Sequence, residues 1–265
     1  MTGVEIRALG AADVSAAVAL LAEVGLGGAA GNLARYLAWQ PACGWAAVRT
    51  ADDALVGSVT VLRQCEVGFV GCMAVAPALQ GSGLGRRLLE HAHVVGRRAG
   101  VVTFLLEATP AGEALYARLG YVTTGETVIA ARAATGAAAA HGRLDADAIC
   151  ALDRAASGLD REDMIRGLLA EGGVGRHLPD RGYGLVIGER LGPVIARDAG
   201  AGRALFDALV APCTVVTAPA HAGAMAVLAA HGFAQVRGLR RMCLGPPPPA
   251  APREQIWALA SPGAG

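Results

Sequence analysis

The sequence contains no lysine, so arginine supplies all of its strongly basic side chains. A P-loop is therefore excluded, because its Gly-Lys-Ser/Thr sequence uses a lysine to contact the phosphates. The net charge is only +1, and we expect neither nucleic acid nor a membrane surface as a partner. No apolar run reaches the length of a membrane-spanning helix, and no N-terminal segment joins basic residues to a long apolar core. We expect a cytoplasmic protein.

The cysteines lack the paired spacing of a metal site or a redox motif, since no two of them form a C-x-x-C pair. We expect reduced, buried thiols and no bound metal. The six cysteines are Cys43, Cys65, Cys72, Cys150, Cys213 and Cys243.

The stretch from Met73 to Arg87 has the composition of an anion-binding turn. An apolar run over residues 67–75 predicts a strand, Pro77 follows it, and the glycine-rich turn Gln80–Gly85 leads into an arginine-rich amphipathic segment. Glycines let the backbone approach a ligand closely, and the N–H groups at a helix start carry partial positive charge. The strand, turn and helix together favour a pyrophosphate site.

The turn by itself leaves alternatives open. A dinucleotide-binding fingerprint places G-x-G-x-x-G directly after the strand, whereas here the spacing is Q-x-x-G-x-G and Pro77 intervenes. An ordinary strand-to-helix turn fits the same residues equally well. The rest of the chain must therefore decide.

The N-terminal half predicts an α+β fold, with a mixed central sheet flanked by helices. An antiparallel meander precedes the glycine turn and its helix, and a fully apolar strand and a proline-led helix come after them. The expected strands are 4–9, 45–49, 55–62, 66–75 and 101–107, with a last pair at 121–123 and 127–132. The expected helices are 13–24 with Asp13 as its cap, a short helix capped by Asn32, 83–99 and 110–119.

A second motif lies about 25 residues after the glycine turn. Residues 107–121, EATPAGEALYARLGY, resemble the helix A-x-x-L-Y-x-x-L-G-F of the GNAT superfamily of N-acetyltransferases, and the Q-x-x-G-x-G turn resembles the acetyl-CoA loop of that family. The order of the expected elements is also that of a GNAT domain. The variant A-T-P-A-G-x-x-L-Y is similar to a narrower subgroup in which two GNAT-type domains run in tandem.

The second half of the chain repeats this organisation. Residues 135–142 are of low complexity and predict a linker between one domain at 1–134 and a second at 143–265. The expected helices are 145–156, one capped by Asp160, 201–210 and 219–232; the expected strands are 183–189, 191–197, 213–218, 236–244 and 255–260.

The second half also departs from the family pattern. Leu228 stands where the first half has Tyr116. Residues 197–202 match R-x-x-G-x-G, but they follow their strand directly and contain Asp198, which would repel a pyrophosphate. We expect a degenerate GNAT-like domain that binds no coenzyme A.

The resemblance implies which residues hold acetyl-CoA in the first half. Main-chain atoms of the strand would bind the pantetheine arm and the thioester, and N–H groups of the turn would bind the pyrophosphate, with one arginine adding a charged contact. The candidate residues are Met73, Ala74, Val75, Gln80, Gly81, Ser82, Gly83, Leu84, Gly85, Arg86, Thr109 and Tyr116.

Acetyl transfer from a thioester to an amine needs a proton acceptor for the amine and a proton donor for the thiolate. Tyr116 falls on the tyrosine of the family motif and is the candidate acid, since a phenol with a pKa of about 10 can protonate a thiolate. Glu66 and Glu107, at the start of one strand and the end of the next, are candidate bases, although a solvated strand-end carboxylate fits each equally well. We expect Cys72 to be a buried, inert thiol and His93 to be remote or exposed.

We therefore expect an acetyl-CoA-dependent N-acetyltransferase that acts on a primary amine of a small molecule or peptide by direct attack in a ternary complex. The first domain would carry the transfer, and the second would shape the acceptor cleft. The alternative is a non-catalytic acyl-CoA-binding or interaction protein that keeps the fold, because no base is obvious. We expect a monomer or a homodimer.

Overall fold

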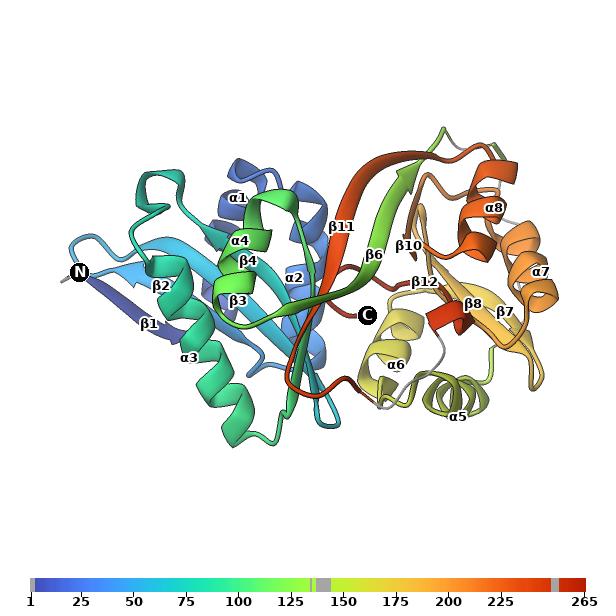
Figure 1. The fold of residues 1–265 in the computed structure, drawn as a ribbon, viewed down its shortest axis with the longest axis horizontal. Helices are drawn as coiled ribbons and strands as arrows, with labels where there is room; N and C mark the ends of the chain where they lie inside the picture. Colours follow the sequence, from blue (N-terminus) through green and yellow to red (C-terminus); the bar gives the residue numbers. More distant parts are fainter. Residues whose placement is uncertain (1–2, 134, 137–143, 249–252) are drawn as a thin grey trace. The chain divides into compact units, whose positions relative to one another are not determined.

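The computed structural model describes residues 3–133, 135–136, 144–248 and 253–265 (Figure 1). These residues form two compact units, and each unit draws on several stretches of the chain. Unit 1 consists of Met1–Leu106, Ala114–Tyr121 and Cys243–Pro246, and unit 2 of Glu107–Glu113, Val122–Met242 and Pro247–Gly265. Most of the linker expected at 135–142 lies outside the described residues, and the expected domain boundaries stay a prediction.

Unit 1 is built on a sheet with the strand order β1-β2-β3-β4-β5. The first four strands are antiparallel, and β5 runs parallel to β4. The strands are β1 (Val4–Ala8), β2 (Gly44–Arg49), β3 (Ala54–Gln64), β4 (Val67–Val75) and β5 (Thr103–Ala108). The helices are α1 (Val14–Glu23), α2 (Gly27–Trp39), α3 (Leu84–Arg98) and α4 (Pro110–Arg118), and the last residues of β5 and the first of α4 are counted with unit 2.

The strands of unit 2 have the order β11-β6-β10-β9-β8-β7, with β12 paired to β9. Only β9 and β10 are parallel among the pairs β6–β10, β9–β10, β8–β9, β7–β8 and β9–β12. The strands are β6 (Val122–Ala131), β7 (Val174–Leu178), β8 (Gly182–Ile187), β9 (Arg190–Ala196), β10 (Val215–Pro219), β11 (Ala234–Leu244) and β12 (Ile256–Ala258). The helices are α5 (Ala146–Ser157), α6 (Glu162–Ala170), α7 (Ala199–Leu209) and α8 (Ala222–Ala230). The predicted α+β class with mixed sheets and flanking helices is confirmed.

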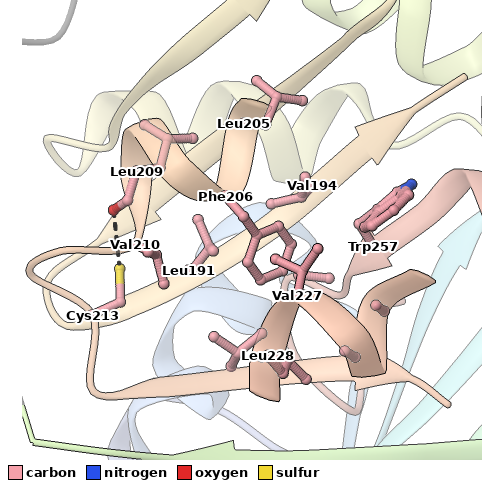
Figure 2. Packing of buried hydrophobic residues seen from close by; sticks show 14 of the residues in the cluster. Leu191, Val194, Leu205, Phe206, Leu209, Val210, Cys213, Val227, Leu228 and Trp257 are labelled. Carbon is pink, nitrogen blue, oxygen red and sulfur yellow. Dashed lines mark hydrogen bonds between the residues drawn. The ribbon is translucent and has the colours of Figure 1, made fainter. Parts of the chain in front are cut away.

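One helix in each unit buries its apolar face in the core. These helices are α3, which follows β4 in unit 1, and α7, which follows β9 in unit 2. In unit 1, α3 buries Leu84, Leu88 and Ala92, which recur every four residues and so line one helix face. In unit 2, Phe206 and Leu209 of α7 pack with Leu191 and Val194 of β9, and Trp257 of β12 joins the same cluster (Figure 2). In both helices the buried apolar residues recur every three or four positions, and this spacing allowed both helices to be predicted from the sequence.

The α1–α2 region differs from the sequence expectation. Asn32 does not cap a helix, because α2 already begins at Gly27 and Asn32 lies inside it, 7% exposed. Packing of Leu33 and Tyr36 into the core outweighs the poor helix propensity of the preceding glycines. Asp13 does precede α1, but its side chain makes no capping hydrogen bond to that helix. Its carboxylate accepts from Arg7 at 2.7 and 2.9 Å and from the Gly10 N–H at 2.9 Å instead.

Three further predictions of strands and helices were wrong. The pair expected at 121–123 and 127–132 is the single strand β6, because local turn residues there are held in the sheet. The strand β7 was missed, since Arg176 and His177 interrupt any apolar run. Pro219 ends β10 and does not start α8; the Nδ1 atom of His221 accepts the Ala224 N–H at 3.2 Å and caps the helix instead.

Candidate active site

The strands β4 and β5 begin side by side and then part. Their parallel pairing runs only from Val67–Thr103 to Phe69–Leu105, although β4 continues to Val75. On its other edge β4 stays paired with β3, but one extra residue interrupts the register near Cys72, whose φ of 47° is left-handed. Such a bulge bends a strand away from its neighbour. The last residues of β4 are thus released from the β5 ladder, and their backbone is available for another partner.

The glycine-rich turn connects this released strand end to α3. The side-chain amide of Gln80 donates to the Val75 carbonyl at 3.1 Å and so ties the turn to the strand. Gly81 and Gly83 have φ values of 76° and 86°, which side-chain-bearing residues rarely adopt. Gly83 occupies the N-cap position of α3, and no side chain caps the helix. The N–H groups of the first turn therefore keep their capacity to bind an anion.

Gly85 fixes how closely α3 approaches the strand. A Cβ atom at this position would lie 3.3 Å from both the Met73 Cε and the Leu115 Cδ2 atoms, and 3.6 Å from Val75 Cγ2. Glycine therefore lets the helix start pack directly on the end of β4. Met73 and Val75 are half-buried, whereas Cys72 before them and Ala74 between them are buried.

The arginines at the start of α3 are exposed. The Arg86 Nε atom donates to Glu90 Oε1 at 2.7 Å, one helical turn further on, and its side chain is 65% exposed. A pair this exposed contributes little stability, so an anionic ligand can compete for the guanidinium. Arg87 donates to the Val4 carbonyl at 3.4 Å instead.

Tyr116, the candidate acid, lies on α4 and is 8% exposed. Burial raises the pKa of its phenol to about 12, so the group keeps its proton throughout the neutral range. Its ring meets the Tyr121 ring edge to face, with centroids 5.7 Å apart. The phenol is therefore protonated at neutral pH, and its ring packs against that of Tyr121.

The position of His93 differs from the sequence expectation. It is neither remote nor exposed but buried in α3, where its Nε2 atom lies 2.7 Å from the Tyr121 hydroxyl and its ring 4.6 Å from that of Phe104. Burial, with a smaller contribution from Arg97, lowers its pKa to about 4, so the ring is neutral at pH 7. Its four-residue spacing from the buried Leu89 was the available signal.

The two candidate bases differ in surroundings. Glu107 is 1% exposed, and its Oε1 atom accepts from Arg241 at 2.7 Å, while Oε2 has no hydrogen-bond partner among the described residues. Glu66 is exposed in the turn before β4, seven residues before Met73, which corresponds to roughly 23 Å of extended strand. This distance argues against Glu66 as the base.

Thr109, just before α4, accepts the Gly112 and Glu113 N–H groups through its carbonyl at 2.9 and 3.1 Å.

The thiol of Cys72, in the released strand, is buried. Burial raises the pKa of the Cys72 thiol to about 12, which keeps it protonated and unreactive. All six cysteines are free, and only Cys65 is exposed, contrary to the expectation that all are buried.

Within the described residues, no group of three or more His, Cys, Asp or Glu side chains could hold a metal ion. No described helix has both the length and the apolar character that crossing a bilayer requires.

Comparison with solved structures supports the fold. A Pyrococcus horikoshii protein described as an acetyltransferase has a TM-score of 0.88 at 21% identity, with 100% of this chain and 97% of that chain covered. A GCN5-related N-acetyltransferase from Sphaerobacter thermophilus has a TM-score of 0.65 at 17% identity, covering 91% and 95%. One from Kribbella flavida has a TM-score of 0.57 at 15% identity, covering 91% and 70%. A sequence search of curated proteins found no significant match.

Family models give the same assignment for both halves. A model described as an acetyltransferase (GNAT) domain matches residues 41–123, and a second model with that description matches residues 149–258. Together these ranges cover most of the chain. The chain therefore belongs to the GNAT acetyltransferase family, with one such domain in each half of its sequence.

Proposed function

We propose that the protein is an acetyl-CoA-dependent N-acetyltransferase whose single transfer site is formed by β4, the glycine-rich turn and α4 in the first half of the chain. The supporting observation is the released end of β4, which the 3-10 turn Pro77–Leu79 connects to an uncapped, glycine-rich helix start. The released strand suits an extended, amide-bearing chain such as pantetheine, and the helix start suits a pyrophosphate. Both features lie on consecutive residues, so one elongated ligand can contact both.

In this proposal the main-chain atoms of Met73, Ala74 and Val75 bind the pantetheine arm and orient the thioester. The N–H groups from Gln80 to Gly85 bind the pyrophosphate, and Arg86 adds a charged contact after leaving Glu90. Thr109, whose carbonyl already holds the first turn of α4, contributes its side chain. Glycines at 81 and 83 leave no Cβ atoms between backbone and phosphate.

Tyr116 acts as the general acid. The neutral acceptor amine attacks the thioester carbonyl directly, the carbon–sulfur bond breaks, and the thiolate takes the proton of the phenol. The new amide nitrogen releases one proton to water, and the Tyr116 phenolate recovers a proton from water. The raised pKa of Tyr116 keeps the proton in place until the thiolate has formed. No covalent intermediate on the protein is needed, and Cys72 stays protonated.

Glu107 remains our candidate for the base. It has one oxygen without a partner in the described chain, which can accept a proton or hold the incoming ammonium group. Arg241 donates to the other oxygen and so holds the carboxylate in place for either role. The acceptor is proposed to be a primary amine of a small molecule or peptide.

Calorimetric titration of acetyl-CoA combined with an assay for released thiol tests the proposal. Binding with release of free coenzyme A in the presence of a panel of primary amines supports it. Binding with no release across a broad panel supports the alternative, a non-catalytic acyl-CoA-binding protein. Absence of binding refutes both.

A further inference from the structure

Unit 2 contains the same strand divergence as unit 1. The parallel strands β9 and β10 pair only at Arg190–Val215 and Leu191–Val216, and then part. The register between β8 and β9 also shifts by one residue after Leu191, as that between β3 and β4 does after Gly71. Both units therefore place one extra residue in the strand that separates from its parallel neighbour.

In unit 2 the space between the diverging strands is filled by the chain itself. The strand β12 pairs with β9, where Ile256 lies opposite Ile195 and Ala258 opposite Val194. On the other side, the Leu259 N–H donates to the Thr217 carbonyl of β10 at 2.7 Å. One short strand thus takes up the hydrogen-bonding edges of both β9 and β10.

The side chain of Trp257 anchors this strand in the hydrophobic core of unit 2. It is 3% exposed and joins the cluster of Phe206 and Val227 (Figure 2). A Cβ atom on Gly202 would lie 2.2 Å from the Trp257 Cε2 atom, and one on Gly223 would lie 2.8 Å from Cη2. The glycines of the α7 and α8 starts are therefore needed for the indole, which explains glycine at 202 without any phosphate.

The start of α7 is occupied as well. Asp198 is its N-cap, and its Oδ1 atom accepts the Ala201 N–H at 2.8 Å and the Arg181 Nη2 at 2.8 Å. A carboxylate therefore already lies where the helix start favours an anion. At the matching place in unit 1, Gly83 provides no side chain.

We propose that unit 2 retains a groove for an extended, amide-bearing ligand and that residues 256–260 of this same chain are its resident ligand. The segment supplies backbone N–H and C=O groups to both strands, its indole fills the groove, and Asp198 supplies the negative charge at the helix start. Unit 2 therefore takes up no acyl-CoA in this groove. The inference stands on unit 2 alone and does not require the catalytic assignment in unit 1.

Hydrogen exchange measured by mass spectrometry on the full chain, with and without acetyl-CoA, tests this inference. We expect the amides of β12 to exchange roughly 100-fold more slowly than an unstructured segment, and acetyl-CoA to leave β9, β10, α7 and β12 unchanged. Protection of β9 or α7 by acetyl-CoA, or faster exchange of β12 on its addition, would overturn the inference. If acetyl-CoA instead protects no residue of unit 1, the proposed function fails and the inference about unit 2 survives.

A pair of variants gives a second readout. Trp257→Phe keeps an aromatic ring in the groove, whereas Trp257→Ala removes it. We expect Trp257→Ala to speed exchange of the β12 amides at least tenfold and to spread to the starts of α7 and α8, while Trp257→Phe stays within about twofold of the parent. Equal behaviour of the two variants would show that the ring does not seat the strand.

Discussion

The two units share the β-bulge and strand divergence but differ in the residues that come next. In unit 1 the released end of β4 leads to a helix start that Gly83 leaves without a side-chain cap. In unit 2 the divergence holds β12, and Asp198 caps the helix. The same backbone geometry therefore occurs both where we propose an acyl-CoA site and where we propose none. Three features distinguish the units: an open strand edge, a neutral N-cap, and a tyrosine at 116 where unit 2 has Leu228.

The units also differ in how their helices are anchored. In unit 2, Asp153 on α5 accepts from Arg161 at 2.5 and 2.9 Å and from the Tyr183 hydroxyl at 2.6 Å, and all three residues are buried. Unit 1 has the neutral contact between His93 and Tyr121 instead. A buried ion pair tolerates the loss of one partner poorly, because the other charge stays desolvated.

The largest expected effect is on the stability of unit 2. Arg161→Leu leaves the Asp153 carboxylate buried without its counter-charge, which should lower the free energy of unfolding by about 3–5 kcal/mol in urea titrations. The control Arg166→Leu removes an exposed arginine from α6, next to the buried pair, and should change little. Acetyl-CoA affinity should stay near the parent value in both, and equal destabilisation by the two variants would contradict the assignment.

The next effect is on turnover. Tyr116→Phe removes the proton donor but keeps the ring, so we expect kcat to fall by roughly 100-fold with little change in the KM for acetyl-CoA. Tyr116→Leu, which copies Leu228 of unit 2, should lose at least as much. Steady-state kinetics with a saturating amine gives both constants; unchanged kcat in Tyr116→Phe would remove the phenol from the reaction.

The N-cap comparison predicts a loss of binding. Gly83→Asp gives α3 the same cap residue as α7, and the new carboxylate should weaken acetyl-CoA binding by roughly 30-fold through repulsion of the pyrophosphate. Gly172→Asp is a matched control, because Gly172 has a φ of 88° and, like Gly83, open space where a Cβ atom would be added. Calorimetric Kd values should separate the two variants; a similar Kd in both would contradict the role of the turn.

The smallest expected effect is on kcat and comes from Tyr121, whose ring contacts that of Tyr116. Tyr121→Phe removes the hydroxyl that contacts His93 and copies Phe233 of unit 2, while the ring contact with Tyr116 remains. We expect a fall in kcat of about three- to fivefold, because the Tyr116 ring loses part of its support. In a Tyr116→Phe background the same change should have no further effect on kcat. An equal fall in both backgrounds would show that Tyr121 acts independently of Tyr116.

Much of the local structure could be predicted from the sequence. The apolar run before Pro77, the glycine turn and the four-residue spacing on α3 predicted strand, turn and helix correctly, because each depends on near neighbours in the chain. Elements with weak local signals were missed or misplaced. Asn32 lies inside α2 because packing of the helix outweighs its glycines, and β7 lacks an apolar run because it carries Arg176 and His177.

The candidate site residues divide in the same way, into those that a local motif identified and those whose surroundings no local motif predicted. The glycine turn and Tyr116 were nominated from their motifs, and their roles stay predictions. Glu66 was nominated for its position along the chain, but a strand of nine residues separates it from the turn. His93 was dismissed, although it faces Tyr121 inside unit 1. Which charged or polar side chains meet depends on contacts between residues far apart in sequence, and these are not encoded in local periodicity.

The sequence by itself determined the family, the α+β class and the difference between Tyr116 and Leu228, because these depend on residue identity and spacing. It also placed Asp198 in the look-alike turn of the second half. Only the tertiary structure decided that β12, some 60 residues further along the chain, lies between β9 and β10 and that Trp257 needs the glycine at 202. The physical reason is that an open strand edge must find hydrogen-bond partners, and folding alone determines whether the chain supplies them.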